Sequence, residues 1–162
     1  MRLELEAPVT GAVSLPDCIA VGFGDGTIRF FRPGLPHTVT QAHTGVVLCM
    51  AADGDHIVTG GDDGRFLRIS PDGSIKELAS FGTKWVDCVA ASPDHYACSS
   101  GRTAHVWSKG QPKATLLEHV STVGGIAFDA KGKRLAVAHY GGVTLWERRE
   151  RRWKSSKLVW KG

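Results

Sequence analysis

The sequence lacks the features of an exported or membrane-spanning protein. Its longest apolar stretch, residues 46–52, is much shorter than the roughly 20 residues needed to cross a bilayer. The first residues, MRLELE, contain no apolar signal-peptide core. Without export a disulfide framework is not expected, and no Cys-x-x-Cys pair occurs among Cys18, Cys49, Cys88 and Cys98. We therefore expect a cytoplasmic protein without membrane contact, whose cysteines serve as small buried apolar residues.

Helical patterns are also missing, whereas glycine is abundant. No segment shows a sustained apolar stripe with a period of 3.6 residues. The 162 residues include 20 glycines and 7 prolines, a density that suits many short strands joined by tight turns. With 42% hydrophobic and 22% charged residues, the chain has enough apolar surface for a packed core. These features predict an all-β fold.

Excess positive charge is absent from most of the chain. The formal net charge is +4, but residues 147–162 hold 7 basic and 2 acidic side chains, so residues 1–146 carry a balance of −1. An even basic face for nucleic acid is therefore not expected. The only candidate for nucleic-acid binding is the stretch RRERR at 148–152. Its simpler interpretation is a charged hairpin tip that discourages edge aggregation.

One pattern recurs about every 39 residues. The aligned segments are IAVGFGDGTIRFF (19–31), IVTGGDDGRFLRI (57–69), YACSSGRTAHVW (96–107) and LAVAHYGGVTLW (135–146). Spacings of 38, 38 and 39 residues separate their closing positions, Phe31, Ile69, Trp107 and Trp146. A second register aligns VLCMAADGDH (47–56) with VDCVAASPDH (86–95). A fixed period of this length indicates a repeat architecture.

Each repeat is predicted to contain four short strands. β-branched and aromatic segments of four to seven residues are bounded by Gly, Asp or Pro. The pairs Asp25-Gly26, Asp63-Gly64 and Gly141-Gly142 can supply the positive φ angles of tight hairpins. The expected fourth strands lie at 38–40, 74–78, 114–117 and 155–160.

Four strands per 39 residues, Asp-Gly turns and a closing tryptophan resemble the WD40 repeat of β-propellers. The resemblance covers about residues 8–160. It implies a single repeat domain, 1–162, with four-stranded antiparallel blades at approximately 8–42, 43–81, 82–118 and 119–162. The sequence departs from the family where the Trp-Asp ending becomes Trp107-Ser108 and Trp146-Glu147.

The resemblance also implies a hydrogen-bonded set of His, Ser/Thr, Asp and Trp that ties each blade. The matching positions are His43, Thr59, Asp63, Trp107, His119 and Trp146. The second repeat replaces the tryptophan with Ile69, and the third and fourth repeats lack the aspartate. No single blade is therefore expected to hold the full set.

Four blades are few for a ring of this family. Left alone, they would expose apolar packing faces at both ends. The chain could be the front half of a longer propeller, two copies could form an eight-bladed ring, or four blades could close by themselves. We favour the first two, because repeats bury their core only by stacking on neighbours. The expected partner is a second copy, in a homodimer, or another half-propeller.

Motifs for catalysis or cofactor binding are weak, and no cofactor is expected. GFGDG at 22–26 fails the dinucleotide-loop spacing, and no nucleophile elbow or paired carboxylates stand out. Triads assemble from distant residues, so an enzyme remains a third interpretation. The seven histidines lack zinc-site spacing. Convergence of His43, His119 and His139 on a central channel gives the alternative of a small-ligand or metal-binding propeller.

Binding of a protein partner is the predicted function. In the family, the loops entering the first strands and the turns between second and third strands converge on one face. That face is expected to present Phe23, His43, Lys84, Trp85, Arg102, Ser121, His139 and Tyr140. Trp85 is either an interface anchor or an inter-blade packing residue, because aromatic and arginine side chains dominate interface energetics. We predict a non-enzymatic scaffold for protein–protein interaction.

Overall fold

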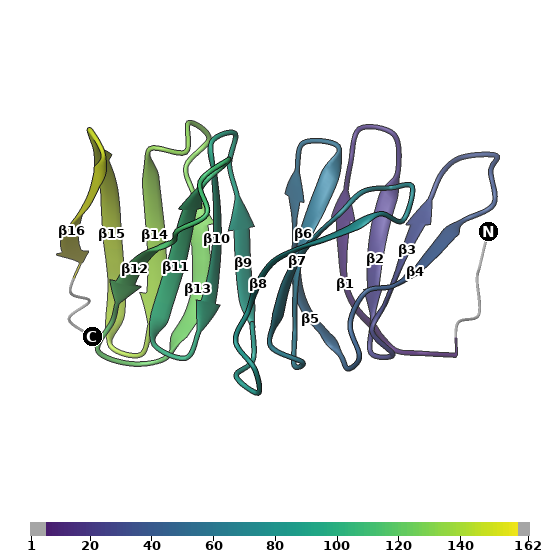
Figure 1. Cartoon of the computed structure of the whole chain (residues 1–162), viewed down its shortest axis with the longest axis horizontal. Coiled ribbons are helices and arrows are strands. Elements are labelled where there is room, and N and C mark those ends of the chain that lie inside the picture. The colour runs from purple at the N-terminus through teal and green to yellow at the C-terminus, as the bar shows by residue number, and fades with distance from the viewer. Residues whose placement is uncertain (1–5, 159–162) are drawn as a thin grey trace.

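A computed structural model of the chain describes residues 6–158, which form sixteen strands in four separate four-stranded sheets (Figure 1). Within each sheet the strands lie in chain order and every neighbouring pair is antiparallel. Residues 6–158 contain no helix, and so none that could span a membrane. The predicted all-β class and the four four-stranded blades are confirmed.

The blades follow one another along the chain, and each begins with its inner strand. Blades 1 and 2 consist of β1 (Val9–Ser14), β2 (Ile19–Phe23), β3 (Thr27–Phe31), β4 (Thr38–Gln41), β5 (Val47–Asp53), β6 (His56–Gly61), β7 (Arg65–Ile69) and β8 (Ile75–Ser80). Blades 3 and 4 consist of β9 (Cys88–Ala91), β10 (His95–Ser100), β11 (Thr103–Ser108), β12 (Thr115–Glu118), β13 (Val123–Phe128), β14 (Arg134–His139), β15 (Gly142–Arg149) and β16 (Arg152–Leu158). The end of the fourth strand predicted at 155–160 lies outside the described residues.

Asp-Gly turns join the second and third strands of the first two blades. Gly26 and Gly64 have positive φ angles of 81° and 74°. The preceding aspartates stabilise the turns, because Asp25 accepts a hydrogen bond from the Thr27 amide (3.0 Å) and Asp63 accepts one from the Arg65 amide (3.1 Å). In each of these Asp-Gly pairs, the aspartate and the glycine therefore both determine the geometry of the hairpin.

The blades stack through their inner strands. β1 packs on β5, β5 on β9, and β9 on β13. Over residues 6–158 no comparable packing joins the fourth strands β4, β8 and β12 of neighbouring blades. Because contact is concentrated at the inner strands, the blades are held together on one side and free on the other, as in a sector of a propeller. Figure 1 shows blades 1 and 4 at opposite ends of the molecule.

Each junction between blades contains one apolar cluster. Ile28 and Phe30 of blade 1 meet Leu67 and Ile69 of blade 2, all fully buried. The second junction is built around Val58 and Phe66, and the third around Val106, Leu135 and Val137. Burying one side chain of this size contributes about 1.5–3 kcal/mol. The core thus lies between the blades and not within any one of them.

Within residues 6–158, the outward face of blade 1 has no such cover. On blade 1, the side chains of Ile19 and Val39 are each 52% exposed. The equivalent of Ile19 in blade 2, Ile57, is completely buried at a junction. The four blades therefore do not close into a ring by themselves. This corrects the third of the three alternatives that the sequence left open.

The turn glycines provide a matched test of backbone and steric constraint. A Cβ at Gly64 would overlap the carbonyl oxygen of Gly82, whereas a Cβ at Gly54 (φ 65°) would meet no atom within 4 Å. Gly54→Ala carries only the cost of a left-handed alanine, about 1 kcal/mol, and Gly64→Ala adds the displacement of the Gly82 segment. We expect Gly64→Ala to lower the free energy of urea unfolding by at least about 2 kcal/mol more than Gly54→Ala. Equal losses for the two variants would contradict this close approach.

Candidate functional site

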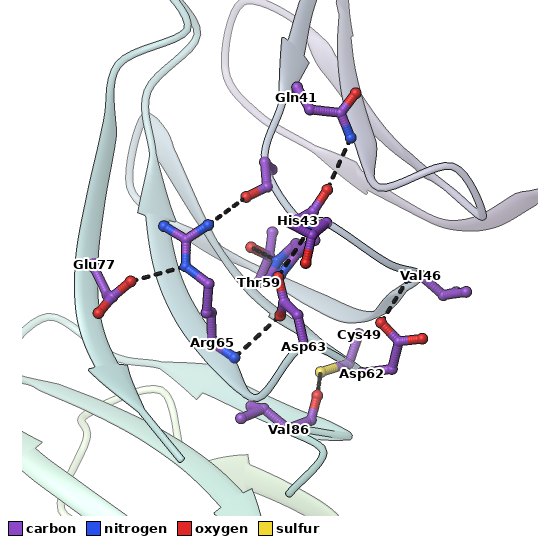
Figure 2. A network of polar contacts seen from close by, with 12 residues as sticks. Gln41, His43, Val46, Cys49, Thr59, Asp62, Asp63, Arg65, Glu77 and Val86 are labelled. Atoms are coloured by element: carbon purple, nitrogen blue, oxygen red, sulfur yellow. Dashed lines mark hydrogen bonds and ion pairs between the residues drawn. The ribbon is translucent and has the colours of Figure 1, made fainter. Parts of the chain in front are cut away.

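A buried histidine links the first two blades (Figure 2). His43 lies in the connection from β4 to β5 and is 1% exposed. Its Nδ1 lies 2.9 Å from an Asp63 carboxylate oxygen, and its Nε2 lies 2.9 Å from the Thr59 hydroxyl. Because the carboxylate can only accept, Nδ1–H donates to Asp63 and Nε2 accepts from Thr59 in the neutral imidazole. The structure thus brings together His43, Thr59 and Asp63 of the expected blade-tying set.

Asp63 and its neighbours extend this network into the surrounding backbone. Asp63 also accepts a hydrogen bond from the Thr44 amide (3.0 Å), and Asp62 accepts one from the Val46 amide (2.8 Å). Arg65 donates to the Ala42 carbonyl (3.1 Å) and to Glu77 (2.8 Å). Side chains of blade 2 therefore hold the incoming connection at both ends (Figure 2).

The environment fixes the charges within the network. Burial lowers the pKa of His43 below its ordinary value, and this outweighs the opposing effect of Asp63. Burial alone would raise the pKa of Asp63, but hydrogen bonds from His43 and from the amides of Thr44 and Arg65 outweigh it and hold the pKa below its ordinary value. The site therefore contains a neutral imidazole beside an ionised carboxylate.

The other blades retain only parts of the expected tie. In blade 4, the Trp146 indole Nε1 donates to His119 Nε2 at 3.1 Å. Trp107 of blade 3 instead packs against Phe66 of blade 2, with ring centroids 5.6 Å apart. Trp107 thus stabilises a junction by apolar contact.

The histidines do not converge as the metal hypothesis requires. His119 and His139 approach with ring centroids 5.4 Å apart, but His139 Nε2 is hydrogen-bonded to Thr144 at 3.0 Å. His43 is committed to Asp63 and Thr59. Within residues 6–158 there is no group of three or more His, Cys, Asp or Glu side chains suited to a metal ion.

Four of the residues predicted for a partner-binding face are exposed together on blades 3 and 4. Trp85 is 60% exposed and Tyr140 is 89% exposed. Lys84 and Arg102 line the same groove as Trp85, which also includes Asp87 and Glu118. The Ser121 hydroxyl donates to the Tyr140 carbonyl at 2.7 Å and so connects two of the loops. We call Lys84, Trp85, Arg102, Val120 and Tyr140 the cationic-aromatic patch.

Val120 was missed by the sequence analysis, although it is 74% exposed. It precedes Ser121 in the loop from β12 to β13, beside the turn that carries Tyr140. A lone valine between polar residues resembles the end of a strand, so the sequence contains no signal for its exposure. Its position follows only from the hydrogen bonds that fold the loop back, among them that from the Val123 amide to the Gly101 carbonyl (2.9 Å).

The remaining predicted face residues are not available to a partner, which corrects their expected exposure. Phe23 is fully buried, and the Arg29 guanidinium lies 4.4 Å above the centre of its ring. His43 and His139 are also buried, each committed to hydrogen bonds within its own network. The exposed residues of the predicted face therefore lie on blades 3 and 4 and are not spread evenly over all four blades.

The basic stretch at 148–152 forms the hairpin between β15 and β16. The Arg148 guanidinium lies 5.8 Å from the centre of the Trp153 ring, and Arg149 pairs with Glu147 at 2.7 Å. Two of the four arginines in this stretch therefore make contacts within blade 4. Nucleic-acid binding by this hairpin stays a prediction.

Four blade-like sheets and a His–Thr–Asp tie are features that this chain shares with WD40 β-propellers. The family described as WD domain, G-beta repeat matches residues 34–67, the segment that includes His43, Thr59 and Asp63. The predicted WD40 resemblance is thereby confirmed. No curated protein matches the chain.

Two solved structures show the same fold. The computationally designed Ika4 protein superimposes with a TM-score of 0.73 at 20% identity, over 89% of this chain and 93% of the designed one. A chain of the Mitotic Checkpoint Complex superimposes with a TM-score of 0.78 at 16% identity, over 94% of this chain. This chain spans 54% of that second chain, or about half its length.

Removing the Thr59 hydroxyl tests the tie. Thr59→Val keeps the shape of the side chain but leaves His43 Nε2 buried without a hydrogen-bond donor, which costs about 1–3 kcal/mol. We expect the free energy of urea unfolding to fall by this amount. Thr115→Val on the exposed strand β12 is the matched control and should change stability by less than about 0.5 kcal/mol. Equal effects of the two variants would show that the hydrogen bond between Thr59 and His43 does not stabilise the fold.

The buried histidines predict a pH dependence of stability. Burial is the leading cause that lowers the pKa of His43, His95, His105 and His119 below the ordinary value of 6.5. As the pH falls through 6.5, the unfolded chain therefore binds protons that the folded chain does not, and the free energy of unfolding decreases. Urea unfolding should show lower stability at pH 5.5 than at pH 7.5. Unchanged or higher stability at pH 5.5 would contradict the stated direction of these shifts.

Proposed function

We propose that the protein is a non-enzymatic scaffold that binds a protein partner through the cationic-aromatic patch. The observation that carries this proposal is the groove in which the exposed Trp85 lies beside Lys84 and Arg102, because exposed apolar surface rimmed by polar residues marks interaction sites. The WD40 family match supports a scaffold role, because this family is associated with protein–protein interaction.

The chemistry of the patch suits a protein partner. Tryptophan, tyrosine and arginine are the residue types that most often contribute large binding energies at interfaces. Arg102 Nε lies 3.8 Å from Glu118, and both side chains are largely solvent-exposed, so the pair contributes little by itself and both groups remain accessible. The groove of about 580 Å³ beside Trp85 is lined by both basic and acidic side chains. It can accept a segment that carries an apolar residue flanked by polar groups.

We also propose that a second copy of the chain completes the propeller. The open apolar faces of blades 1 and 4 support this homodimer, because repeats bury such faces only by stacking. Cytoplasmic location stays a prediction.

Substitution of Trp85 tests the interaction patch. Peptides selected from a random displayed library on the wild-type protein would be measured against Trp85→Ala by surface plasmon resonance. Loss of an aromatic anchor costs at least about 2 kcal/mol, so we expect affinity to fall by a factor of roughly 30. Leu35→Ala, at a 63% exposed position in the β3–β4 loop, is the control and should bind as the wild type does.

Selected peptides that bind Trp85→Ala as well as the wild type would contradict the proposed patch. Thermal unfolding of the variant should match the wild type, because Trp85 is exposed and absent from the three apolar clusters of the described core.

A further inference from the structure

Every blade has two chemically different faces, and the forward face, toward the next blade, carries small residues on its inner strands. Directly paired residues share a face, and the central forward pairs are Gly11 with Gly22, Cys49 with Gly60, Cys88 with Ser99, and Gly125 with Ala138. Small side chains therefore occupy the same forward position in all four blades.

Close approach of the next blade explains these small residues. A Cβ on Gly22 would come within 3.0 Å of Val47 and 3.2 Å of the Met50 sulfur, both in blade 2. A Cβ on Gly60 would overlap the Val86 carbonyl oxygen in the segment that enters blade 3. A larger side chain at this position would push the following blade away.

The backward face, toward the preceding blade, carries large residues instead. The corresponding pairs of second and third strands are Ile57 with Ile69, Tyr96 with Trp107, and Leu135 with Trp146. In blade 1 the equivalent pair is Ile19 with Phe31. At all three junctions the small inner-strand positions of a forward face thus meet the large backward face of the next blade. Third-strand residues of the forward face, such as Phe30 and Phe66, are themselves large.

The two open faces of the row correspond to the two faces that meet at each junction, one forward and one backward. Within residues 6–158, blade 4 ends the row with a forward face that no further blade covers, and this face contains Gly125, Ala127, Ala136 and Ala138 together with Val143 and Leu145. Blade 1 begins it with an uncovered backward face that contains Ile19, Val21 and Phe31. A groove of about 670 Å³ lies at the edge of the blade 1 face and is lined by Ile19, Phe31 and Arg32.

One edge contact of the first junction is not repeated at the open faces. At the first junction Arg32 reaches blade 2 and donates to the Pro71 carbonyl at 3.1 Å. The repeat equivalent of Arg32 in blade 4 is Glu147, which follows Trp146 as Arg32 follows Phe31 and which pairs with Arg149. Because a carboxylate cannot donate to a carbonyl, a contact between blade 4 and blade 1 would rest on the apolar faces and not on this edge.

We propose that the forward face of blade 4 in one copy packs on the backward face of blade 1 in a second copy. The same contact made twice closes a two-fold symmetric ring of eight blades, in which no packing face remains open. This head-to-tail interface rests on the completion by a second copy proposed above, and it does not involve the cationic-aromatic patch.

Two variants that each block one face test the arrangement. Ala138→Trp places a large side chain on the forward face of blade 4, and Ile19→Glu places a charge on the backward face of blade 1. Ile19 is 52% exposed and Ala138 is half-buried on the outward face of blade 4, so each chain should still fold. Light scattering coupled to size exclusion at about 50 μM should give the wild type twice the chain mass of 17.4 kDa. Each variant alone should give the mass of one chain.

Mixing the two variants distinguishes head-to-tail pairing from other dimers. An equimolar mixture contains intact blade 4 faces on Ile19→Glu and intact blade 1 faces on Ala138→Trp, so it should recover a species of two chains. That recovery also shows that both variants are folded. Should Ala138→Trp fail to fold, Ala127→Arg, at an exposed position on the same face, replaces it. The control Ala130→Trp, in the exposed β13–β14 turn of blade 4, should keep the wild-type mass.

Several results would overturn the proposal. A wild-type chain that is monomeric at this concentration would leave the open faces to further blades of a longer chain. Dimers that only one of the two variants disrupts would indicate like-to-like pairing of identical faces, and a mixture that stays monomeric would exclude the head-to-tail contact. Trp85→Ala should retain the wild-type mass, so loss of the interface and loss of partner binding are separate outcomes.

Discussion

The packing of the apolar face of one blade on the apolar face of the next is the interaction on which this molecule depends. Each sheet by itself is a four-stranded ribbon without an interior. The buried side chains, such as Ile28 and Phe30 against Leu67 and Ile69, lie between sheets. Because the hydrophobic contribution scales with the apolar area removed from water, nearly all of it comes from these junctions. The hydrogen bonds within a blade set its shape, and the neighbouring blade makes that shape stable.

Polar networks add specificity to this apolar stacking at particular places. The His43 network is the most complete, and it fixes the connection between blades 1 and 2. Asp53 of blade 2 makes a second polar link, because it binds Arg68 of its own blade (2.6 Å) and Lys109 of blade 3. Breaking one partner of such a buried pair leaves an uncompensated charge, so these links discriminate strongly against a wrong blade register.

The sequence predicted the architecture because a repeat period is a global signal. The recurrence of Phe31, Ile69, Trp107 and Trp146 located the third strand of each described blade. Asp25-Gly26 and Asp63-Gly64 located two turns, since the glycine conformation and the aspartate cap are local requirements. The His43, Thr59 and Asp63 set could be named because its members occupy fixed positions within one repeat.

Exposure of individual site residues could not be predicted in the same way. Phe23 ends its strand at the same register position as the buried His139, whereas Tyr140 comes one residue later, in the turn, and faces solvent. This difference of one residue follows from the pairing of the first and second strands, and the sequence alone does not fix that register. The exposure of Val120 depends similarly on how a loop folds back on its neighbour. Residue types recur with the period, whereas such contacts are particular to each blade.

Because the forward and backward faces of each blade differ, the row of blades has a direction, and its two ends are not equivalent. A new unit can always be added to either end, because each end presents the surface that the other end requires. Affinity between faces therefore cannot limit the number of units, and only the angle between successive blades can. If that angle brings the row back to its beginning, growth stops in a ring, and a small change in taper would instead produce a filament that elongates indefinitely. The small side chains at the inner strands set how closely the blades approach on that side, so they help to determine where assembly ends.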